Sequence, residues 1–420
     1  MSRVRHFILR SLRALDPVHQ QYEAYPYPAR DPADEATRLI EGSPSDPVEV
    51  DHFLFAGMRD WSQPFRVLVA GGGTGDALIM LAQKLTDIGC PAAITYLDLS
   101  TASREIAEAR AAARGLTGIR FVTADLMTAP DLGLFDYIDC CGVLHHLADP
   151  DAGFRALASA LAEQGGMGLM VYAPYGRSGV YPLQEAFGAL LASDPPERKV
   201  AVAKAAMSAL AGTHPFARNP LLGDHRDSDA GLYDLLLHGR DRPYTAPEVC
   251  EALEGAGLAP VSFLEPARYD PMRYLPGDSD LKSRVQAMPA PMRAGVAEKL
   301  AGNMKTHIVY ATHAARADGA MARGNKPDLI PHLRGAAPMP LAKQVKAKGG
   351  FRLSSDGLDH WIAIAGSAAQ MIAAIDGKAT LGEIAGRSGL DWIAFLQHWG
   401  GVSRNLTGFN LLHYSKGARR

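Results

Sequence analysis

Short apolar runs alternate with helical patterns between residue 65 and about residue 172. The apolar runs predict five strands, at "FRVLVA" (65–70), "AAITYLDLS" (92–100), "IRFVTADL" (119–126), "FDYIDCCGV" (135–143) and "GMGLMVYA" (166–173). Apolar residues at helical spacing predict intervening helices over 77–85, 102–114 and about 153–162. Apolar strands separated by helices are typical of a parallel sheet that is buried on both faces. We therefore expect a doubly wound α/β domain with a mostly parallel sheet.

The helical pattern continues without strands between residues 175 and 244. A helical insert at this point, directly after the fifth strand, would cover the carboxyl end of the sheet as a substrate cap. A helix ending near Gly255, a strand after it and a further apolar strand from Met304 restore the alternation. The α/β domain is therefore predicted to occupy residues 46–314, with the insert at 175–244.

The rest of the chain divides into three further parts. Residues 1–45 hold an amphipathic helix and a segment rich in tyrosine and proline. Residues 315–338 are predicted to be a linker, because alanine, glycine and proline follow no sustained period there. Residues 339–420 predict several helices, one of them opened by the capping-box pair Thr380 and Glu383. This tail resembles a winged-helix module.

The composition is that of a globular protein, and we expect it in the cytoplasm. Apolar residues make up 47% of the 420 residues, and the formal net charge of −2 gives no global attraction to a polyanion or a membrane. The four cysteines match neither a disulfide framework nor a metal site, which favours a reducing compartment. No apolar stretch approaches the roughly 18 residues of a membrane span.

The amino-terminal helix lacks the apolar core of a secretory signal, which leaves a helix docked on its own protein, a transit peptide or a partner-binding helix.

Three glycines, Gly71, Gly73 and Gly75, lie in the turn after the first predicted strand. Doubly wound sheets bind ligands at the carboxyl ends of their strands, and the first strand-to-helix turn is the usual place. Glycine removes the β-carbons that would keep a ligand from the backbone, although a turn needed only for helix packing has the same composition. The next two strands end at Asp98 and Asp125, at the same edge of the sheet. Each aspartate alone is equally typical of a helix cap, but together with the glycines they predict a nucleoside site.

The segments "VLVAGGGTG", "YLDLS", "FVTADL" and "FDYIDCCGVLHHLADP" resemble, in order and spacing, the motifs of class I S-adenosylmethionine-dependent methyltransferases. The resemblance covers about residues 60–175 and implies a seven-stranded sheet with S-adenosyl-L-methionine as the cofactor. Its ribose would lie on Asp98 and its adenine beside Asp125. The implied cofactor contacts are Gly71, Gly73, Gly75, Asp98, Leu99, Asp125, Leu126 and Cys141. Val69 stands where the family commonly has an acidic residue, so other residues would hold the methionine amino group.

A dinucleotide-binding enzyme is the main alternative for such a turn. Its fingerprint needs a third glycine where this chain has Asp76, whose carboxylate would repel a pyrophosphate. S-adenosylmethionine has no phosphate and contains a cationic sulfonium, so the charge favours the methyl donor.

Tyrosines and prolines alternate in "QQYEAYPYPAR", residues 20–30, which cannot continue a helix. We predict that this segment is a lid, in which Tyr22 and Tyr27 present aromatic faces to the sulfonium. Arg30 could then pair with the carboxylate of the cofactor. The alternative is a strap whose tyrosines only pack on the surface of the domain.

His145 and His146 follow the fourth strand and would lie beside the transferred methyl group, where a histidine could act as a general base. The pair could equally be structural, since positioning supplies most of the rate for a nucleophilic acceptor. Tyr233, Asp234 and His238 of the insert are candidates for the acceptor pocket, and we count Tyr233 and His238 among the candidate catalytic residues. No metal is expected, because the histidines and acids of the insert match no compact ligand spacing.

The tail, residues 339–420, contains ten lysines and arginines against five acids. Its last predicted helix contains mainly apolar residues such as Trp392, Phe395 and Trp399, so we expect protein docking or self-association and no nucleic-acid recognition. Every cofactor motif precedes residue 147, so removal of the tail is expected to leave cofactor binding intact.

The sequence thus predicts a methyltransferase that acts on a nitrogen or oxygen atom of a protein or peptide. Two alternatives stay open: the same chemistry on a small-molecule acceptor, and an interaction module that binds S-adenosylmethionine without turnover. The second alternative is motivated by Val69, which stands where the family commonly has an acidic residue.

Overall fold

The computed structural model describes residues 17–417, so the predicted amphipathic helix at the amino terminus lies outside the described residues. A seven-stranded sheet occupies the centre, in the order β3-β2-β1-β4-β5-β7-β6. Its strands are β1 (Phe65–Ala70), β2 (Ala92–Asp98), β3 (Ile119–Thr123), β4 (Phe135–Cys141), β5 (Leu161–Tyr172), β6 (Leu258–Phe263) and β7 (Thr306–His313). Strands β1 to β5 run parallel, and β7 runs antiparallel to both of its neighbours. The predicted doubly wound, mostly parallel α/β fold is confirmed.

Alternate residues of β1 enter two different hydrophobic cores, one on each face of the sheet. Val67 and Val69 pack in one core with helices α3 (Pro47–Leu54) and α4 (Asp76–Asp87). Leu68 and Ala70 pack in the other with α6 (Pro150–Ala160) and α11 (Ala246–Gly255). All four side chains are at most 1% exposed. Since successive side chains of a strand point to opposite faces, a continuous apolar run is what a sheet covered on both sides requires.

Most of the predicted helix starts have their capping side chains in place. Ser100 caps α5 (Thr101–Ala113), Asp149 caps α6, and Thr245 forms a capping box with Glu248 at α11. Each cap satisfies an amide that would otherwise lack a partner at the start of a helix. Helix α6 ends at Ala160, slightly earlier than its apolar pattern suggests, because β5 begins at Leu161.

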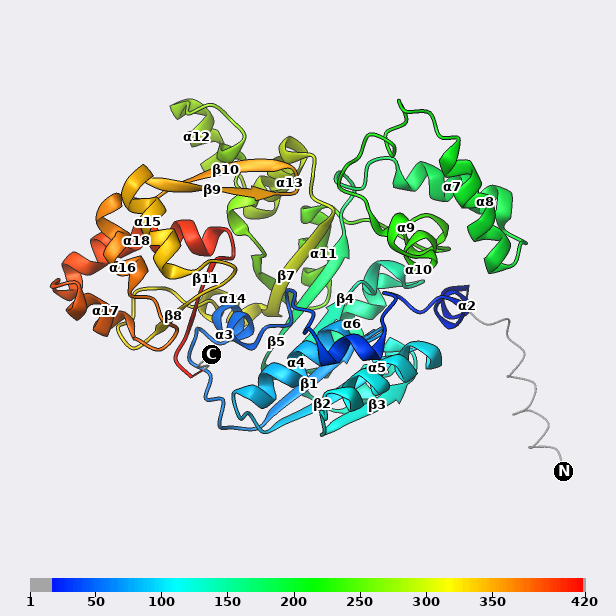
Figure 1. The fold of residues 1–420 in the computed structure, drawn as a ribbon, viewed down its shortest axis with the longest axis horizontal. Coiled ribbons are helices and arrows are strands. Elements are labelled where there is room, and N and C mark those ends of the chain that lie inside the picture. Colours follow the sequence, from blue (N-terminus) through cyan, green and yellow to red (C-terminus); the bar gives the residue numbers. More distant parts are fainter. Residues whose placement is uncertain (1–16, 418–420) are drawn as a thin grey trace.

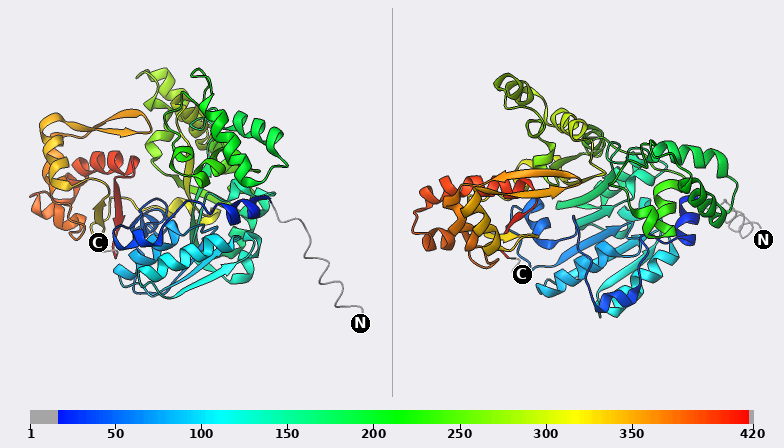
Figure 2. Two further views of the ribbon diagram at one scale, coloured as in Figure 1. Left: turned by 45° about the vertical axis from the view of Figure 1, so that its right-hand side comes forward. Right: turned by 45° about the horizontal axis from the view of Figure 1, so that its top comes forward.

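The predicted insert is a helical lobe with a hydrophobic core of its own. Its elements are α7 (Val180–Leu191), α8 (Pro196–Ser208), α9 (Asp224–Asp227), α10 (Asp229–Leu232) and a π-helical turn (Tyr233–Leu237). Figures 1 and 2 show this lobe beside α2 (Pro17–Ala24), on the side of the sheet opposite the C-terminal elements. An amino-terminal segment and the insert after β5 therefore come together beside the sheet.

The chain between β6 and the tail contains more structure than its sequence pattern indicated. Two further helices separate β6 from β7, namely α12 (Ser279–Ala287) and α13 (Ala290–Ala301). The stretch predicted as a linker contains α14 (Ala317–Ala320) and strand β8 (Ile330–Leu333). That prediction was wrong for β8, which pairs antiparallel with β11 (Leu412–Ser415) at the far end of the tail. A partner strand about 80 residues away leaves no local pattern in such a short segment.

The tail forms a compact unit around a buried aromatic cluster. Its remaining elements are α15 (Pro338–Lys348), β9 (Gly350–Ser355), β10 (Leu358–Ala363), α16 (Ala369–Ala373), α17 (Leu381–Arg387) and α18 (Trp392–Gly408). Phe395 and Trp399 of α18 are fully buried and stack with ring centroids 5.5 Å apart, so they belong to the core of this unit. Thr380 and Glu383 form the predicted capping box of α17. The resemblance to a winged helix stays a prediction.

Helix α3 joins this C-terminal unit to the sheet through buried polar groups. Glu49 accepts a hydrogen bond from the hydroxyl of Tyr310 at 2.7 Å and forms an ion pair with Arg334. Asp51 accepts a hydrogen bond from Ser415 at 2.6 Å. Glu49 and Asp51 are inaccessible to solvent, so the C-terminal unit is part of what buries this face of the α/β domain.

None of the helices within residues 17–417 is long and apolar enough to cross a membrane.

Candidate active site

One large cavity opens where the glycine turn, the ends of several strands and the insert meet. Its volume is about 680 Å³. Predicted site residues make up a large part of its lining: Tyr22, Tyr27, Gly71, Gly73, Asp98, Leu99, Asp125, Leu126, Cys141 and His146. The cavity adjoins β1 and β4, where the strand order reverses direction, which is the usual ligand position in an open α/β sheet.

Gly71 and Gly73 must be glycines, because other segments of the protein approach the turn closely at both positions. Their φ angles of 69° and 50° lie in the left-handed region. A β-carbon on Gly71 would come within 2.2 Å of a methyl group of Val143, and one on Gly73 within 2.8 Å of the carbonyl oxygen of Tyr27. The tyrosine and proline segment therefore lies directly on the glycine turn.

Gly75 has a different role from the one predicted. It does not line the cavity but precedes α4 with a φ of 102°, and a β-carbon there would come within 3.1 Å of Ala107 on α5. The close packing of two helices requires this glycine. Helix packing was the alternative explanation for the glycine cluster, and it holds at this position.

Asp98 lies at the end of β2 and holds the glycine turn in place. One carboxylate oxygen accepts a hydrogen bond from the amide of Gly73, and the other accepts one from the amide of Ser100, both at 2.8 Å. Burial raises the pKa of Asp98, although these amide hydrogen bonds oppose that effect. A carboxylate oxygen can accept more than one hydrogen bond, so Asp98 retains acceptor capacity on the side that lines the cavity.

Asp125 both caps a helix and lines the cavity. It accepts a hydrogen bond from the amide of Met127 at 2.9 Å, at the start of the 3-10 helix Leu126–Leu132. Helix capping, the alternative interpretation of this residue, therefore holds, and its contact with the cofactor stays a prediction.

Arg30 pairs with a side chain of the protein, Asp76, and not with the cofactor carboxylate that was predicted as its partner. Its guanidinium donates to both oxygens of Asp76, at 2.9 and 2.7 Å, and Arg30 does not line the cavity. Arg110 donates to the same carboxylate at 2.8 Å. Burial alone would raise the pKa of Asp76, but the hydrogen bonds from Arg30 and Arg110 outweigh it and lower the pKa. Two cations neutralise Asp76, so its predicted repulsion of a pyrophosphate is weaker than the sequence suggested.

The tyrosine and proline segment is attached to the rim of the cavity by hydrogen bonds. Ser100 donates to the carbonyl oxygen of Tyr22 at 3.2 Å, and Thr74 donates to that of Pro28 at 2.6 Å. Helix α2 ends at Ala24, because Tyr25 precedes a proline and is excluded from the helical region. Both Tyr22 and Tyr27 line the cavity, as a lid would require.

At the other end of the cavity, the insert places Asp234 between two tyrosines. The hydroxyl of Tyr22 donates to one oxygen of Asp234 at 3.0 Å, and the hydroxyl of Tyr172 donates to the other at 2.9 Å. Burial raises the pKa of Asp234, with the hydrogen bond from Tyr172 acting in the opposite direction. Tyr172 ends β5 and was missed in the sequence, although a polar residue at the end of a predicted strand could have signalled it.

The neighbour of Asp234, Tyr233, was wrongly placed in the acceptor pocket. Its side chain stacks on Tyr25 at a centroid distance of 5.4 Å and belongs to the core of the insert. Tyr233 therefore packs inside the insert, whereas the adjacent Asp234 lines the cavity.

The three histidines pack together at the cavity wall. The rings of His146 and His238 are nearly parallel, with their centroids 3.7 Å apart. The ring of His145 packs against that of Tyr172, with a centroid distance of 4.1 Å. Of the three histidines, His146 lines the cavity, whereas His145 and His238 do not. The candidate catalytic roles of His145 and His238 are therefore not supported by a direct approach to the cavity.

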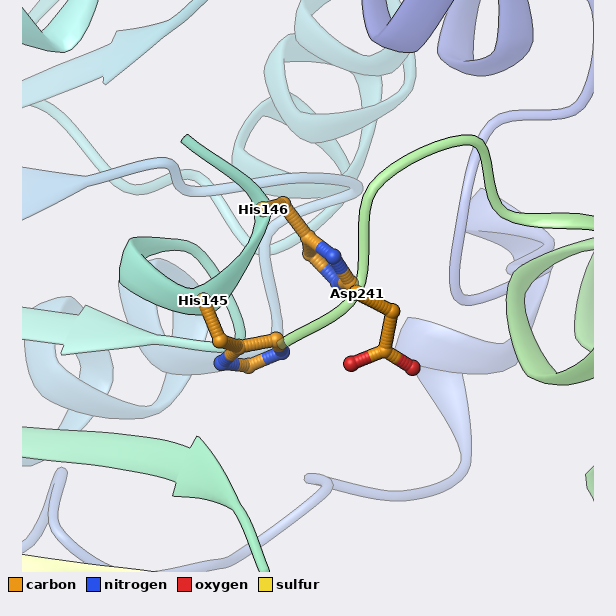
Figure 3. A group of neighbouring side chains, drawn as sticks. All are labelled: His145, His146 and Asp241. Atoms are coloured by element: carbon orange, nitrogen blue, oxygen red, sulfur yellow. The ribbon is translucent and has the colours of Figure 1, made fainter. Parts of the chain in front are cut away.

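Figure 3 shows His145 and His146 on one short turn, facing Asp241 from the segment that closes the insert. Their potential ligand atoms lie within 4.8 Å of one another, as do those of His146, Asp234 and His238. Asp241 is already held by Arg177, whose guanidinium donates to it at 2.9 Å. His238 accepts the amide of Arg240 at its Nδ1, so in the neutral ring Nε2 keeps its proton and has no free lone pair. These hydrogen bonds oppose metal binding, and the absence of a metal stays a prediction.

Asp139 is a further residue of the cavity that sequence reasoning did not single out. Burial raises the pKa of Asp139 to about 6, and its carboxylate accepts a hydrogen bond from Ser45 at 2.6 Å. Because it lies inside strand β4 rather than at its end, the rule that locates sites at strand ends passes over it.

Comparison with known proteins identifies the domain that contains this cavity. Residues 68–167, from β1 into β5, match the family model for a methyltransferase domain. The chain contains a class I methyltransferase domain.

The chain also has relatives among whole proteins. A protein of Synechococcus sp. is 32% identical over 231 residues, which cover 53% of this chain and 54% of that protein. The match thus spans about half the length of that relative. PKMT2 from Rickettsia typhi has the same fold at 14% identity, with a TM-score of 0.61 over 89% of this chain and 75% of that one. Its complex with AdoHcy gives 15% identity and the same TM-score over 89% and 76%.

Proposed function

We propose that this chain binds S-adenosyl-L-methionine in the cavity and transfers its methyl group to a nitrogen or oxygen atom of a protein or peptide. One observation carries the proposal. A single cavity of about 680 Å³ has the glycine turn and Asp98 at one end and Asp234, Tyr172 and His146 at the other. Methyl transfer needs donor and acceptor aligned in one space that excludes water, and such positioning supplies much of the rate.

The cofactor contacts follow from the lining residues. Asp98 accepts hydrogen bonds from the ribose hydroxyls, and Asp125 and Leu126 lie beside the adenine. Leu99 and Cys141 complete the wall, and the rings of Tyr22 and Tyr27 face the sulfonium, whose charge favours aromatic faces. Arg30 has no part in this arrangement, because Asp76 occupies its guanidinium.

A protein or peptide acceptor is supported by the extent of the shared fold. The likeness to PKMT2, a protein methyltransferase, extends over 89% of this chain and so beyond the methyltransferase domain itself. A small-molecule acceptor and a module without turnover are the alternatives, and the buried Asp234 at the acceptor end favours an enzyme over the module.

Two measurements test the proposal. Calorimetry with S-adenosylmethionine and S-adenosylhomocysteine should detect binding of both, and absence of binding would contradict the proposal. Incubation with a labelled methyl donor and a cell lysate should place the label in macromolecules. Label that extracts with metabolites would establish the small-molecule alternative, and binding without any transfer would establish the module.

A further inference from the structure

We infer that Asp234 recognises the methyl acceptor as a cationic amine and takes its proton. This inference rests on the proposed function, because it names the chemical class of acceptor for the same cavity. It assigns to Asp234 a direct contact with the acceptor nitrogen. The observations that carry it are the burial of the carboxylate, its partners and its place on the cavity.

Asp234 is a carboxylate at the cavity wall that is only 3% exposed. Among residues 17–417, no cationic side chain forms a direct ion pair with it. Its hydrogen-bond partners within residues 17–417 are the neutral hydroxyls of Tyr22 and Tyr172. Arg177 lies nearby, but its guanidinium is directed to Asp241 at 2.9 Å. A charge buried without a counter-ion is costly, and an ammonium group that enters the cavity would offset this cost. A neutral hydroxyl or thiol acceptor would not.

The remainder of this end of the cavity also suits a cation. The rings of Tyr22 and Tyr27 line the space next to Asp234, whereas the ring of Tyr172 already has the guanidinium of Arg177 at 3.7 Å from its centroid. Electron-rich ring faces attract an ammonium ion, and more strongly where water is excluded. The two tyrosine hydroxyls keep both carboxylate oxygens oriented, and each oxygen can accept a further hydrogen bond from the substrate.

The groups that face Asp234 allow it to accept a proton. Tyr22 of α2, Tyr172 of β5, His146 and Arg177 surround it. Burial raises the pKa of Asp234, while the charges of His146 and Arg177 and the two hydroxyls act in the opposite direction. The other nearby base, His238, is less suited, because burial lowers the pKa of its ring well below the usual range.

The reaction step balances without any further reagent. One proton moves from the ammonium group of the acceptor to Asp234, which leaves a neutral amine with a lone pair. That lone pair forms the new nitrogen–carbon bond as the carbon–sulfur bond breaks, and the electron pair of the broken bond stays on sulfur. The products are a cationic methylated amine, a neutral thioether and a protonated Asp234.

A binding experiment on the full chain, saturated with S-adenosylhomocysteine, tests the recognition. The probes are n-butylammonium chloride and n-butanol, measured by calorimetry for the native chain, Asp234→Asn and Asp227→Asn. Asp227 is a matched control, because it is an exposed aspartate of the same insert that does not line the cavity. We expect the native chain and Asp227→Asn to bind n-butylammonium at least about tenfold more tightly than Asp234→Asn does, and n-butanol to show no such difference.

The outcomes separate this inference from the proposed function. Failure to bind S-adenosylhomocysteine would contradict the proposed function itself. Normal S-adenosylhomocysteine binding with equal n-butylammonium affinity in the native chain and Asp234→Asn, or with no n-butylammonium binding at all, would overturn only the amine assignment. The chemical form of the label in the lysate experiment is a second readout. Recovery as an N-methyl amine after acid hydrolysis supports the inference, and release as methanol by base, which marks a methyl ester, overturns it.

Discussion

The hydroxyl of Tyr22 donates a hydrogen bond to Asp234 across 3.0 Å, although the two residues are 212 positions apart in the sequence. Tyr22 belongs to the segment that lies on the glycine turn, and Asp234 belongs to the helical insert. The contact therefore joins the two parts that close the cavity from opposite sides. It also connects the cofactor end of the cavity with the acceptor end. The carbonyl oxygen of Tyr22 accepts a hydrogen bond from the hydroxyl of Ser100, and the amide of Ser100 donates to Asp98.

Replacing Tyr22 by phenylalanine tests this contact. In the native chain, the hydrogen bond from Tyr22 stabilises the charged form of Asp234 and thereby lowers the pKa of Asp234. The change to phenylalanine removes this hydrogen bond. In Tyr22→Phe the pKa of Asp234 should rise, and the acid limb of the pH profile of kcat/KM should move to higher pH, since Asp234 must be ionised to accept a proton. The measurement is methyl transfer against pH. Tyr25→Phe is the control, because this neighbouring tyrosine stacks on Tyr233 through its ring, which the change retains. An acid limb of the pH profile that does not move in Tyr22→Phe would exclude Asp234 as the base.

Asp98→Ala should weaken cofactor binding. The change removes charge-assisted hydrogen bonds to the ribose, each of which contributes about 1.5 to 3 kcal/mol. The affinity for the cofactor should therefore fall at least tenfold. It also releases the amides of Gly73 and Ser100, which adds to the loss by loosening the turn. Calorimetry with S-adenosylhomocysteine measures the affinity, with circular dichroism to check the fold. Asp87→Ala, an exposed aspartate at the end of α4, should bind as the native chain does. Equal affinity in the two variants would remove the ribose assignment.

Arg334→Met should destabilise the fold through Glu49. The arginine is the cation that pairs with this buried carboxylate, and leaving such a charge unpaired costs roughly 3 kcal/mol. Chemical denaturation measures the free energy of unfolding. Arg352→Met removes an exposed pair with Asp359 instead, and its effect should stay within about 0.5 kcal/mol.

The destabilisation of Arg334→Met should also depend on pH. Burial raises the pKa of Glu49 already in the native chain, and the loss of Arg334 raises that pKa further. An acid with a raised pKa in the folded state stabilises the fold when protonated, so the stability of the variant should fall as pH increases from about 4.3, the usual value for glutamate. A deficit that is equal at pH 4 and pH 7 would contradict this assignment.

Removal of residues 339–420 should destabilise the methyltransferase domain, contrary to the expectation from the order of the motifs. Asp51 accepts a hydrogen bond from Ser415, and His52 accepts the amide of Tyr414 at 3.1 Å, so truncation leaves buried polar groups of α3 without partners. Limited proteolysis and thermal unfolding of the truncated chain provide the measurement. A truncated chain that unfolds at the native temperature and binds S-adenosylhomocysteine would restore the original expectation.

Chelation should leave methyl transfer unchanged. Arg177 already pairs with Asp241, and the amide of Arg240 fixes the proton of His238 on the nitrogen that a metal would need. The rate of labelled transfer should therefore be equal before and after dialysis against EDTA. A loss that Zn²⁺ restores would place a metal in the histidine cluster.

The sequence alone predicted the features that depend on local pattern. The apolar run of β1 indicates a strand buried on both faces, and the glycines after it indicate a turn that another chain segment or a ligand must approach. Asp98 and Asp125 were located because the carboxyl ends of parallel strands meet at one edge of the sheet. In each case the information lies within a few residues of the position that it describes.

Only the tertiary structure decided which side chains meet across the cavity. Nothing near Arg30 indicates that Asp76 holds it, and nothing near Asp234 indicates that it, and not Tyr233, faces the cavity. The pairing of β8 with β11 is equally invisible in a segment of four residues. The periods of 3.6 and 2 residues set which face of an element is apolar, but the partners of a polar side chain depend on how distant elements pack, so they follow from the whole fold.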